Sequence, residues 1–257
     1  PKKINLGGGS NFNQFGWLNF DINSSLYPTK FDKNTIFPNI SNSIDLIYSS
    51  HAFEHFDDQT INKLLTEIKR VLVKNGKLLI IIPDYDFLLE KWIKRDSAFF
   101  YKDFELGFNK HLHFWKNKNI DDNLDNRAAF MFCSYWNKEF EDKKYRAFQS
   151  KNLNPYSKNI FWGPPNFDQK QLLNILKNNS PKEVTNFLRK SVIEKNTDYI
   201  FCHQNAWSKK ELVKTVESYG FEAVNTNKEK IVNLDFVKNI FGSKEHYDLS
   251  NYFLFKN

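Results

Sequence analysis

The stretch KINLGGGSNFNQFGWLNFDI, residues 3–22, decides the fold that the sequence predicts. Residues 3–8 are predicted to form a short strand that runs into three consecutive glycines. Residues 17–22 alternate between apolar and polar side chains, which predicts a second strand ending at the acid Asp21. The segment between the two strands is too short for a full helix. The chain therefore opens with two strands joined by a glycine-rich loop.

The next part of the chain predicts a loop, a strand and a helix. Residues 23–43 are loop-like because two prolines interrupt them, and residues 44–48 form a clear apolar strand. Asp57 or Asp58 can cap a helix that runs to about Lys74 with apolar residues along one face. This helix is amphipathic, so we expect its apolar face to pack on a sheet.

An apolar run after that helix marks the centre of the predicted sheet. Asn75–Gly76 stop the helix, and residues 77–82 are apolar on both faces, as a central parallel strand requires, before Pro83 ends them. Residues 221–224 and 252–255 predict two late strands. Because strands and helices alternate, the predicted fold is α/β: an open, doubly wound, mostly parallel sheet with helices on its faces.

A long segment between the early and late strands has a different pattern. Residues 87–199 contain aromatic-rich helical patterns and almost no strand signal. One helix begins at the capping box Ser180–Glu183, and a later one begins at the capping box Ser208–Glu211. The predicted organisation is a core domain of residues 1–86 and 200–257, with residues 87–199 as a large helical insertion after the central strand.

The composition limits the binding partners and the cellular compartment that we expect for the protein. The chain has 257 residues and a net charge of +7, so nucleic acid is one alternative partner. The lysines are dispersed, which favours a solvated surface over a phosphate-binding stripe. The sequence contains no apolar stretch of about 20 residues, so it predicts no membrane span. The N-terminus shows no export pattern. Two cysteines, Cys133 and Cys202, predict neither a disulfide framework nor a zinc cluster. We therefore expect a cytoplasmic protein.

The candidate site residues follow the strands, because ligands of open α/β sheets bind beyond the carboxyl ends of the strands. Asp21 is placed to accept both hydroxyls of a ribose, unless it is a helix cap or a surface acid. His51 follows the strand at 44–48 and is either a general base or a residue that shapes the pocket by packing. Asp84 and Asp86 follow the central strand and could take a proton from a substrate, although Asp84 could equally cap the next helix.

Two familiar motifs compete for these residues. A nicotinamide-binding motif requires G-x-G-x-x-G opening a full helix, but Phe12 stands where the third glycine belongs and Asp21 comes too early. Residues 51–55, HAFEH, match the H-x-x-E-H string of certain zinc peptidases. That motif needs both histidines on one helix, whereas this stretch lies between a strand and a new helix. The sequence disfavours a dehydrogenase and predicts no metal site.

Three segments in this order resemble the class I S-adenosylmethionine-dependent methyltransferases, and they are most similar to the small type 11-like branch. The segments are INLGGGSNFNQFGWLNFDI (residues 4–22), NSIDLIYSSHAFEHFDD (42–58) and LLTEIKRVLVKNGKLLIIIPDYD (64–86). Residues 203–224 resemble the late helix and strand of the family more weakly. The resemblance implies a Rossmann-like fold, S-adenosylmethionine as the cofactor and methyl transfer as the activity.

The resemblance also implies which residues contact the cofactor, with Asp21 at the ribose and Asp32 near the adenine. The implied cofactor residues are Gly7, Gly8, Gly9, Asp21, Ile22, Asp32, Ser49 and Ser50. Gly8 replaces the cysteine that is usual in this branch, a change that we expect to be harmless. Asn5 stands where many relatives carry an acid near the cofactor amine.

The helical insertion is predicted to form a lid that selects the methyl acceptor. Acids and aromatic residues interrupt its lysine clusters, which favours a small-molecule or glycan-type acceptor over nucleic acid. The alternatives are a nucleic-acid methyltransferase and a catalytically inactive, methyltransferase-like binding module. The oligomeric state is not predicted. The predicted catalytic residues are His51 and Asp84, and the predicted acceptor-binding residues are Asp86, His111, His113 and His203.

Overall fold

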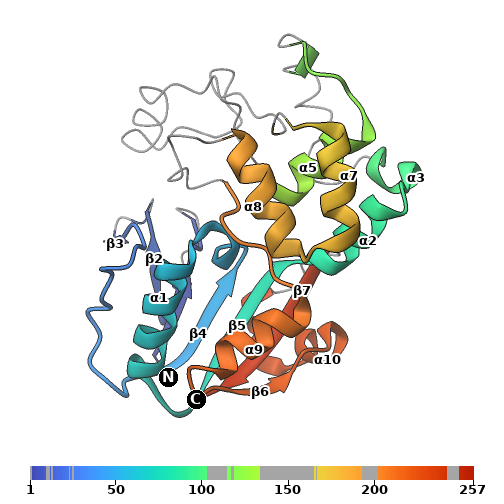
Figure 1. Ribbon diagram of the computed structural model, residues 1–257. Helices are drawn as coiled ribbons and strands as arrows, with labels where there is room; N and C mark the ends of the chain where they lie inside the picture. The colour runs from blue at the N-terminus through green and yellow to red at the C-terminus, as the bar shows by residue number, and fades with distance from the viewer. Residues whose placement is uncertain are drawn as a thin grey trace. The chain divides into compact units, whose positions relative to one another are not determined.

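The computed structural model divides the chain into two compact units. The first unit is Pro1–Asp84 with Lys209–Asn257, and the second is Tyr85–Ser208 (Figure 1). The first unit holds the sheet, and the second is built from helices. Within the described part of the chain, no helix combines the length and the apolar character needed to span a bilayer. The structure describes residues 2–9, 12, 14–22, 24, 26–102, 115–116, 119–133, 165, 167–192, 202–241 and 249–257.

The first unit is organised around one sheet with the strand order β3-β2-β1-β4-β5-β7-β6 (Figure 1). The strands β3, β2, β1, β4 and β5 pair in parallel, and β7 pairs antiparallel with both β5 and β6. This arrangement confirms the predicted doubly wound, mostly parallel sheet. The strands are β1 (Lys3–Leu6), β2 (Trp17–Asp21), β3 (Tyr27–Pro28), β4 (Ile44–Ser50), β5 (Leu72–Pro83), β6 (Glu222–Asn225) and β7 (Ser250–Lys256).

The central strand β5 is buried on both of its faces. Residues 78–82 have no exposed surface. Leu79 and Ile81 belong to a core cluster with apolar residues of α10 (Lys228–Val232) and α11 (Asp235–Phe241). Because side chains alternate along a strand, the residues between them face the opposite side of the sheet. The continuous apolar run in the sequence therefore reflects burial on two sides.

Helix α1 (Asp58–Val71) begins where the sequence predicts. The side chain of Asp57 accepts a hydrogen bond from the backbone N–H of Thr60 at 2.8 Å, which is an N-cap. The other end differs from the prediction, because the helix stops at Val71 and β5 starts at once at Leu72. The buried residues of this helix are Thr60, Ile61, Leu64, Leu65, Glu67, Ile68 and Val71.

Pairing with distant strands explains this early start of β5. Leu72 is the pairing partner of Ile44 in β4. The N–H of Asn75 donates to the carbonyl of Asn257, and the N–H of Asn257 donates to the carbonyl of Gly76, both at 2.9 Å. The prediction that Asn75 and Gly76 end the helix is therefore wrong. They lie in β5, whose pairing partners are far away in the chain.

The loop before β4 is fastened to α1 by one arginine. Arg70 donates to the carbonyls of Phe37 and Asn39, each at 3.0 Å. The same guanidinium donates to both carboxylate oxygens of Glu67, at 3.1 and 2.8 Å, and Glu67 also accepts the N–H of Phe37. Glu67 is buried, so this bidentate pair supplies the partners that its charge requires.

We expect Glu67→Gln to lower the free energy of unfolding by about 1.5–3 kcal/mol at neutral pH. The hydrogen bond from Arg70 is the largest of the effects that lower the pKa of Glu67 from its ordinary value of 4.5. A lowered pKa stabilises the fold above that ordinary value, and this contribution is lost as the pH falls through the folded-state pKa. Urea unfolding should therefore show the difference between wild type and variant shrinking below about pH 4.5.

The matched control is Glu90→Gln in the second unit, which removes an exposed pair between Glu90 and Lys94. Exposed pairs of this kind contribute little to stability, because solvent and salt screen them. Equal losses for the two variants at neutral pH would contradict the role given to Glu67.

The glycine loop leaves no room for a side chain at Gly8. A Cβ atom placed there would lie 1.9 Å from Nδ2 of Asn5 and 2.6 Å from Oδ1 of Asn19. Asn5 and Asn19 are buried and are paired partners on β1 and β2. The cysteine of related sequences and Gly8 are therefore not interchangeable in this chain, because the side chain of Asn5 fills the space.

We expect Gly8→Ala to destabilise the first unit by about 1–3 kcal/mol or more, because the new methyl group overpacks a filled site. Asn5→Ala should relieve much of this cost, so the double variant should be more stable than the sum of the two single losses predicts. Urea unfolding of the three variants gives the interaction energy directly. Additive losses would show that Asn5 is not the group that excludes a side chain at Gly8.

The described part of the second unit is helical, as the sequence predicts for this region. Helix α8 begins at the predicted capping box, where the N–H of Ser180 donates to Oε2 of Glu183 at 2.8 Å. Trp92 and Phe132 are among the largest buried side chains here. The free thiols Cys133 and Cys202 are buried, and burial raises the pKa of Cys133. The helices are α2 (Tyr85–Ile93), α3 (Ser97–Phe100), α5 (Leu124–Cys133), α7 (Gln169–Asn178) and α8 (Pro181–Val192).

Candidate active site

The parallel strands of the first unit bring four predicted residues to one edge of the sheet. Gly7 follows β1, Asp21 ends β2, His51 follows β4 and Asp84 follows β5. These four strands are neighbours in the sheet and run parallel, so their carboxyl ends lie along the same edge. This is the edge where open α/β sheets bind their ligands.

The glycine loop folds back onto the end of β2. The N–H of Gly7 donates to the carbonyl of Phe20 at 2.9 Å. The N–H of Gly9 donates to Oδ2 of Asp21 at 3.0 Å, and Nδ2 of Asn19 donates to the carbonyl of Gly9 at 2.7 Å. The N–H groups of Gly7 and Gly9 are thus bonded within the chain.

Glycine is nevertheless required at both positions. Gly7 and Gly9 have φ values of +75° and +68°, which other residues rarely adopt. A Cβ atom at Gly7 would lie 2.5 Å from Cβ of Ala52, whereas one at Gly9 would have no atom of the described residues within 4 Å, its chain neighbours apart. Among the described residues, none fills the space that a side chain at Gly9 would take.

The remaining residues that the sequence assigns to the cofactor differ in their surroundings. Ile22 and Ser50 are half-buried at the ends of β2 and β4. The hydroxyl of the fully buried Ser49 donates to the carbonyl of Leu6 at 3.2 Å, so this side chain serves the sheet. The exposed Asp32 accepts the N–H of Asn34 at 2.7 Å within its own turn. Contacts of these four residues with a cofactor stay predictions.

His51 is held between an acid and a hydroxyl at the same edge. Its Nε2 lies 2.9 Å from Oγ of Ser250, and its Nδ1 lies 3.2 Å from Oε1 of Glu54. The side chain of His51 is 34% exposed, whereas that of Glu54 is fully buried. The backbone of His51 has φ +50°, which is rare for a residue other than glycine and is found at functional sites.

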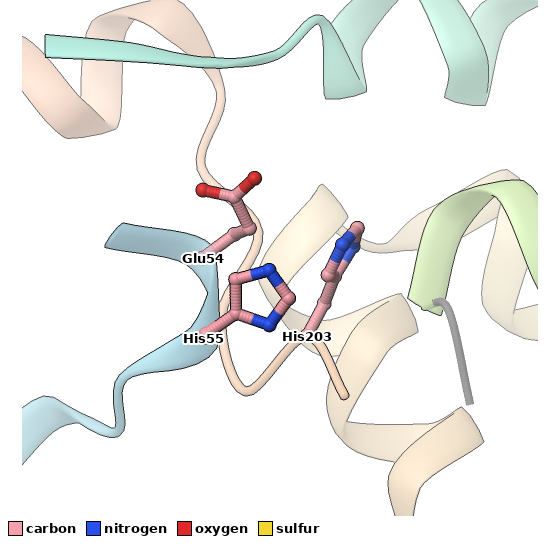
Figure 2. A group of neighbouring side chains, drawn as sticks. All are labelled: Glu54, His55 and His203. Atoms are coloured by element: carbon pink, nitrogen blue, oxygen red, sulfur yellow. The ribbon is translucent and has the colours of Figure 1, made fainter. Parts of the chain in front are cut away.

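The turn after β4 answers the question that the H-x-x-E-H string raises. Phe53–His55 form one short 3-10 turn, Phe56 is extended, and α1 starts only at Asp58. Glu54 and His55 both project from this turn (Figure 2). His51 precedes the turn, so the two histidines do not share the helix that the zinc-peptidase motif requires. The predicted strand-to-helix turn is confirmed.

A family model described as a methyltransferase domain matches residues 29–80, which include β4, α1 and most of β5. The matched segment lies in the region where the sequence resembles the class I S-adenosylmethionine-dependent methyltransferases. The match and the sheet order agree with the fold and the cofactor that the sequence predicts.

Solved structures of several methyltransferases are similar to this chain, and no curated protein matches it. An S-adenosylmethionine-dependent methyltransferase from Mesorhizobium loti has 10% identity over 100% of this chain and 90% of its own, with a TM-score of 0.42. One from Aquifex aeolicus has 17% identity over 33% of this chain and 57% of its own, with a TM-score of 0.26. PKMT2 from Rickettsia typhi, solved in complex with AdoHcy, has 9% identity over 99% of this chain and 48% of its own, with a TM-score of 0.39.

The residues at this edge of the sheet are compatible with S-adenosylmethionine. Among the described residues, none fills the space beside Gly9, and the carboxylate of Asp21 is oriented by the N–H of Gly9. An acid at the end of the second strand suits the two hydroxyls of a ribose. We expect Asp21 and the glycine loop to hold the nucleoside part of the cofactor.

The two acids after β5 lie in different units. Asp84 ends the first unit and is half-buried, and its N–H donates to the carbonyl of Leu249 at 2.8 Å. Asp86 is exposed in the first turn of α2 in the second unit. Their roles as base and acceptor ligand stay predictions.

His203 is anchored inside the second unit. Its ring atom Nδ1 lies 2.8 Å from the carbonyl oxygen of Phe132 and 2.9 Å from the hydroxyl oxygen of Tyr85. The backbone N–H of His203 donates to the carbonyl of Cys133 at 2.9 Å. A carbonyl oxygen only accepts, so these contacts favour a proton on Nδ1. The ring is drawn in Figure 2. His111 and His113 lie outside the described residues.

Sequence reasoning missed the two partners of His51. The H-x-x-E spacing of His51 and Glu54 is the signal that could have indicated this contact. Ser250 carries no sequence signal, because it stands 199 positions from His51 and only the pairing of β5 with β7 brings it close.

Proposed function

We propose that the chain is an S-adenosylmethionine-dependent methyltransferase that transfers the methyl group to a hydroxyl or amine of a small-molecule or sugar-bearing acceptor, with His51 as the general base. The surroundings of the ring support this role most directly. Nε2 lies 2.9 Å from the hydroxyl oxygen of Ser250, a distance that permits transfer of an O–H proton. The ring is also partly exposed, so a substrate can reach it.

The chemistry leaves the protein two tasks. Bound S-adenosylmethionine supplies an electrophilic methyl group on a sulfonium. The residues of the chain must align the acceptor with that group and remove the acceptor proton. As the acceptor oxygen or nitrogen forms its bond to the methyl carbon, its proton passes to Nε2 of His51. Asp84, at the end of β5, is the second candidate for this proton.

The proposed acceptor class rests on charge and on chain connectivity. The lysine-rich stretches at residues 110–118 and 143–151 contain aromatic residues and are flanked by acids, which does not favour a continuous surface for phosphates. The second unit leaves the first after Asp84 and rejoins it at Lys209. It remains the predicted lid and acceptor-recognition module, with Asp86 and His203 as its described candidate contacts.

Two measurements test the proposal in sequence. Calorimetry with S-adenosylhomocysteine should give saturable binding. Incubation with methyl-labelled S-adenosylmethionine and cell extract should then place label in the small-molecule or glycan fraction. Label in the nucleic-acid fraction, with binding that weakens steeply as salt rises, would replace the proposed acceptor class. Binding of S-adenosylhomocysteine without any labelled product would point to a binding module.

A further inference from the structure

We propose that Glu54 and Ser250 are positioning residues that hold His51 in the tautomer with its proton on Nδ1, so that Nε2 is the proton acceptor. This inference rests on the proposed role of His51 as the base. The three side chains come from separate places in the fold: the end of β4, the 3-10 turn after it, and the first residue of β7. Together they form an acid–imidazole–hydroxyl line at the carboxyl edge of the sheet.

The direction of this line follows from donor and acceptor chemistry. A carboxylate only accepts hydrogen bonds, so a hydrogen bond between Glu54 and the ring nitrogen 3.2 Å away requires the proton on Nδ1. Nε2 then has a lone pair, and the Ser250 hydroxyl at 2.9 Å donates to it. An acid that orients a histidine in this way fixes both the tautomer and the ring plane of a general base.

Burial makes the acid depend on His51. Glu54 has no exposed surface, and among the described residues neither of its carboxylate oxygens has a formed hydrogen bond. The contact of Oε1 with Nδ1 of His51 is at ion-pair distance, 3.2 Å. A buried carboxylate without partners is costly, so the pairing with His51 also stabilises Glu54.

The backbone at His51 serves the same arrangement. Its positive φ is strained for a histidine, and its N–H is held by the carbonyl of Ile81 at 2.9 Å. This N–H anchors the turn across the end of β5, and the ring reaches Ser250 on β7, the strand beyond. The strain thus accompanies a ring position that an extended residue at the end of β4 would not reach.

The line has a defined part in methyl transfer. The acceptor oxygen or nitrogen forms a bond to the methyl carbon, the carbon–sulfur bond breaks, and its electron pair stays on sulfur as a neutral thioether. The acceptor proton moves to Nε2, replacing the Ser250 hydroxyl as its donor. The imidazolium that results stands beside the Glu54 carboxylate, which stabilises it.

The direct test is the tautomer of His51 in the full-length protein. Nitrogen-15 NMR of histidine-labelled protein at about pH 8, where an ordinary histidine is neutral, should show the His51 ring protonated on Nδ1. The signals of His51 are those that disappear in His51→Asn. In Glu54→Gln we expect a mixture of tautomers and a fall in kcat of on the order of 10²-fold, with KM and S-adenosylhomocysteine affinity within about twofold of wild type.

Matched variants separate positioning from stability. Glu67→Gln makes the same change at another buried acid of the first unit, and it should leave both the tautomer and kcat unchanged. Ser250→Ala should lower kcat, and Ser250→Thr, which keeps the hydroxyl, should restore it; this pair decides the proposal if Glu54→Gln does not fold. A wild-type ring protonated on Nε2, or full activity in both Glu54→Gln and Ser250→Ala, would overturn the inference. A wild type that transfers no methyl group would overturn the proposed function, while the tautomer would still test the contact between Glu54 and His51.

Discussion

Replacing His51 with asparagine is expected to lower kcat for methyl transfer by about 10²- to 10⁴-fold, the usual contribution of a general base. Asparagine tolerates positive φ better than other non-glycine residues, so the backbone at φ +50° is preserved. Its amide cannot take up the acceptor proton. The measurement is the initial rate of label transfer at saturating S-adenosylmethionine, with S-adenosylhomocysteine affinity measured alongside.

A second variant distinguishes loss of the base from local damage. His51→Gly relaxes the backbone and leaves space where the ring was, so added imidazole should recover part of the lost rate. A fall in kcat with unchanged cofactor affinity, together with rescue by imidazole, identifies a base. If His51→Asn keeps kcat within about threefold of wild type, the base is another group, and Asp84 becomes the candidate to test next.

The sheet was predictable because its signals are local. Alternation along β1 and β2, the two-sided apolar run of β5 and the cap at Asp57 are each visible within a few residues. The boundary at Leu72–Gly76 was not, because the hydrogen bonds with Asn257 that extend β5 come from the far end of the chain. A two-residue strand such as β3, which contains a proline, carries too little pattern to be found.

The positions of the candidate residues along the edge of the sheet were predictable for the same reason. Gly9, Asp21 and His51 follow from the rule that ligands bind at the carboxyl ends of strands. Contacts between distant segments were out of reach: Ser250 meets His51 only through the order of the strands. The close fit of Asn5 against Gly8 depends on atomic spacing that residue types do not encode.

Replacing Asp21 with alanine is expected to weaken binding of S-adenosylhomocysteine by about 10- to 150-fold, which corresponds to a loss of roughly 1.5–3 kcal/mol of charged hydrogen bonding. Two interactions are removed together. The ribose hydroxyls lose a carboxylate acceptor, and the N–H of Gly9 loses its 3.0 Å bond to Oδ2. Calorimetry with the folded variant gives the dissociation constant.

Two further variants identify which of these interactions matters. Asp21→Asn retains an oxygen that can accept the N–H of Gly9 but carries no charge, so it isolates the contribution of the ribose contact. Asp45→Ala is the matched control, because Asp45 also accepts a backbone N–H, that of Lys2 at 2.6 Å, but lies near the start of β4, at the opposite edge of the sheet. We expect Asp21→Asn to weaken binding by about tenfold and Asp45→Ala to leave it unchanged. Wild-type affinity in Asp21→Asn would show that Asp21 acts by shaping the glycine loop, and the ribose contact would then have to come from another residue.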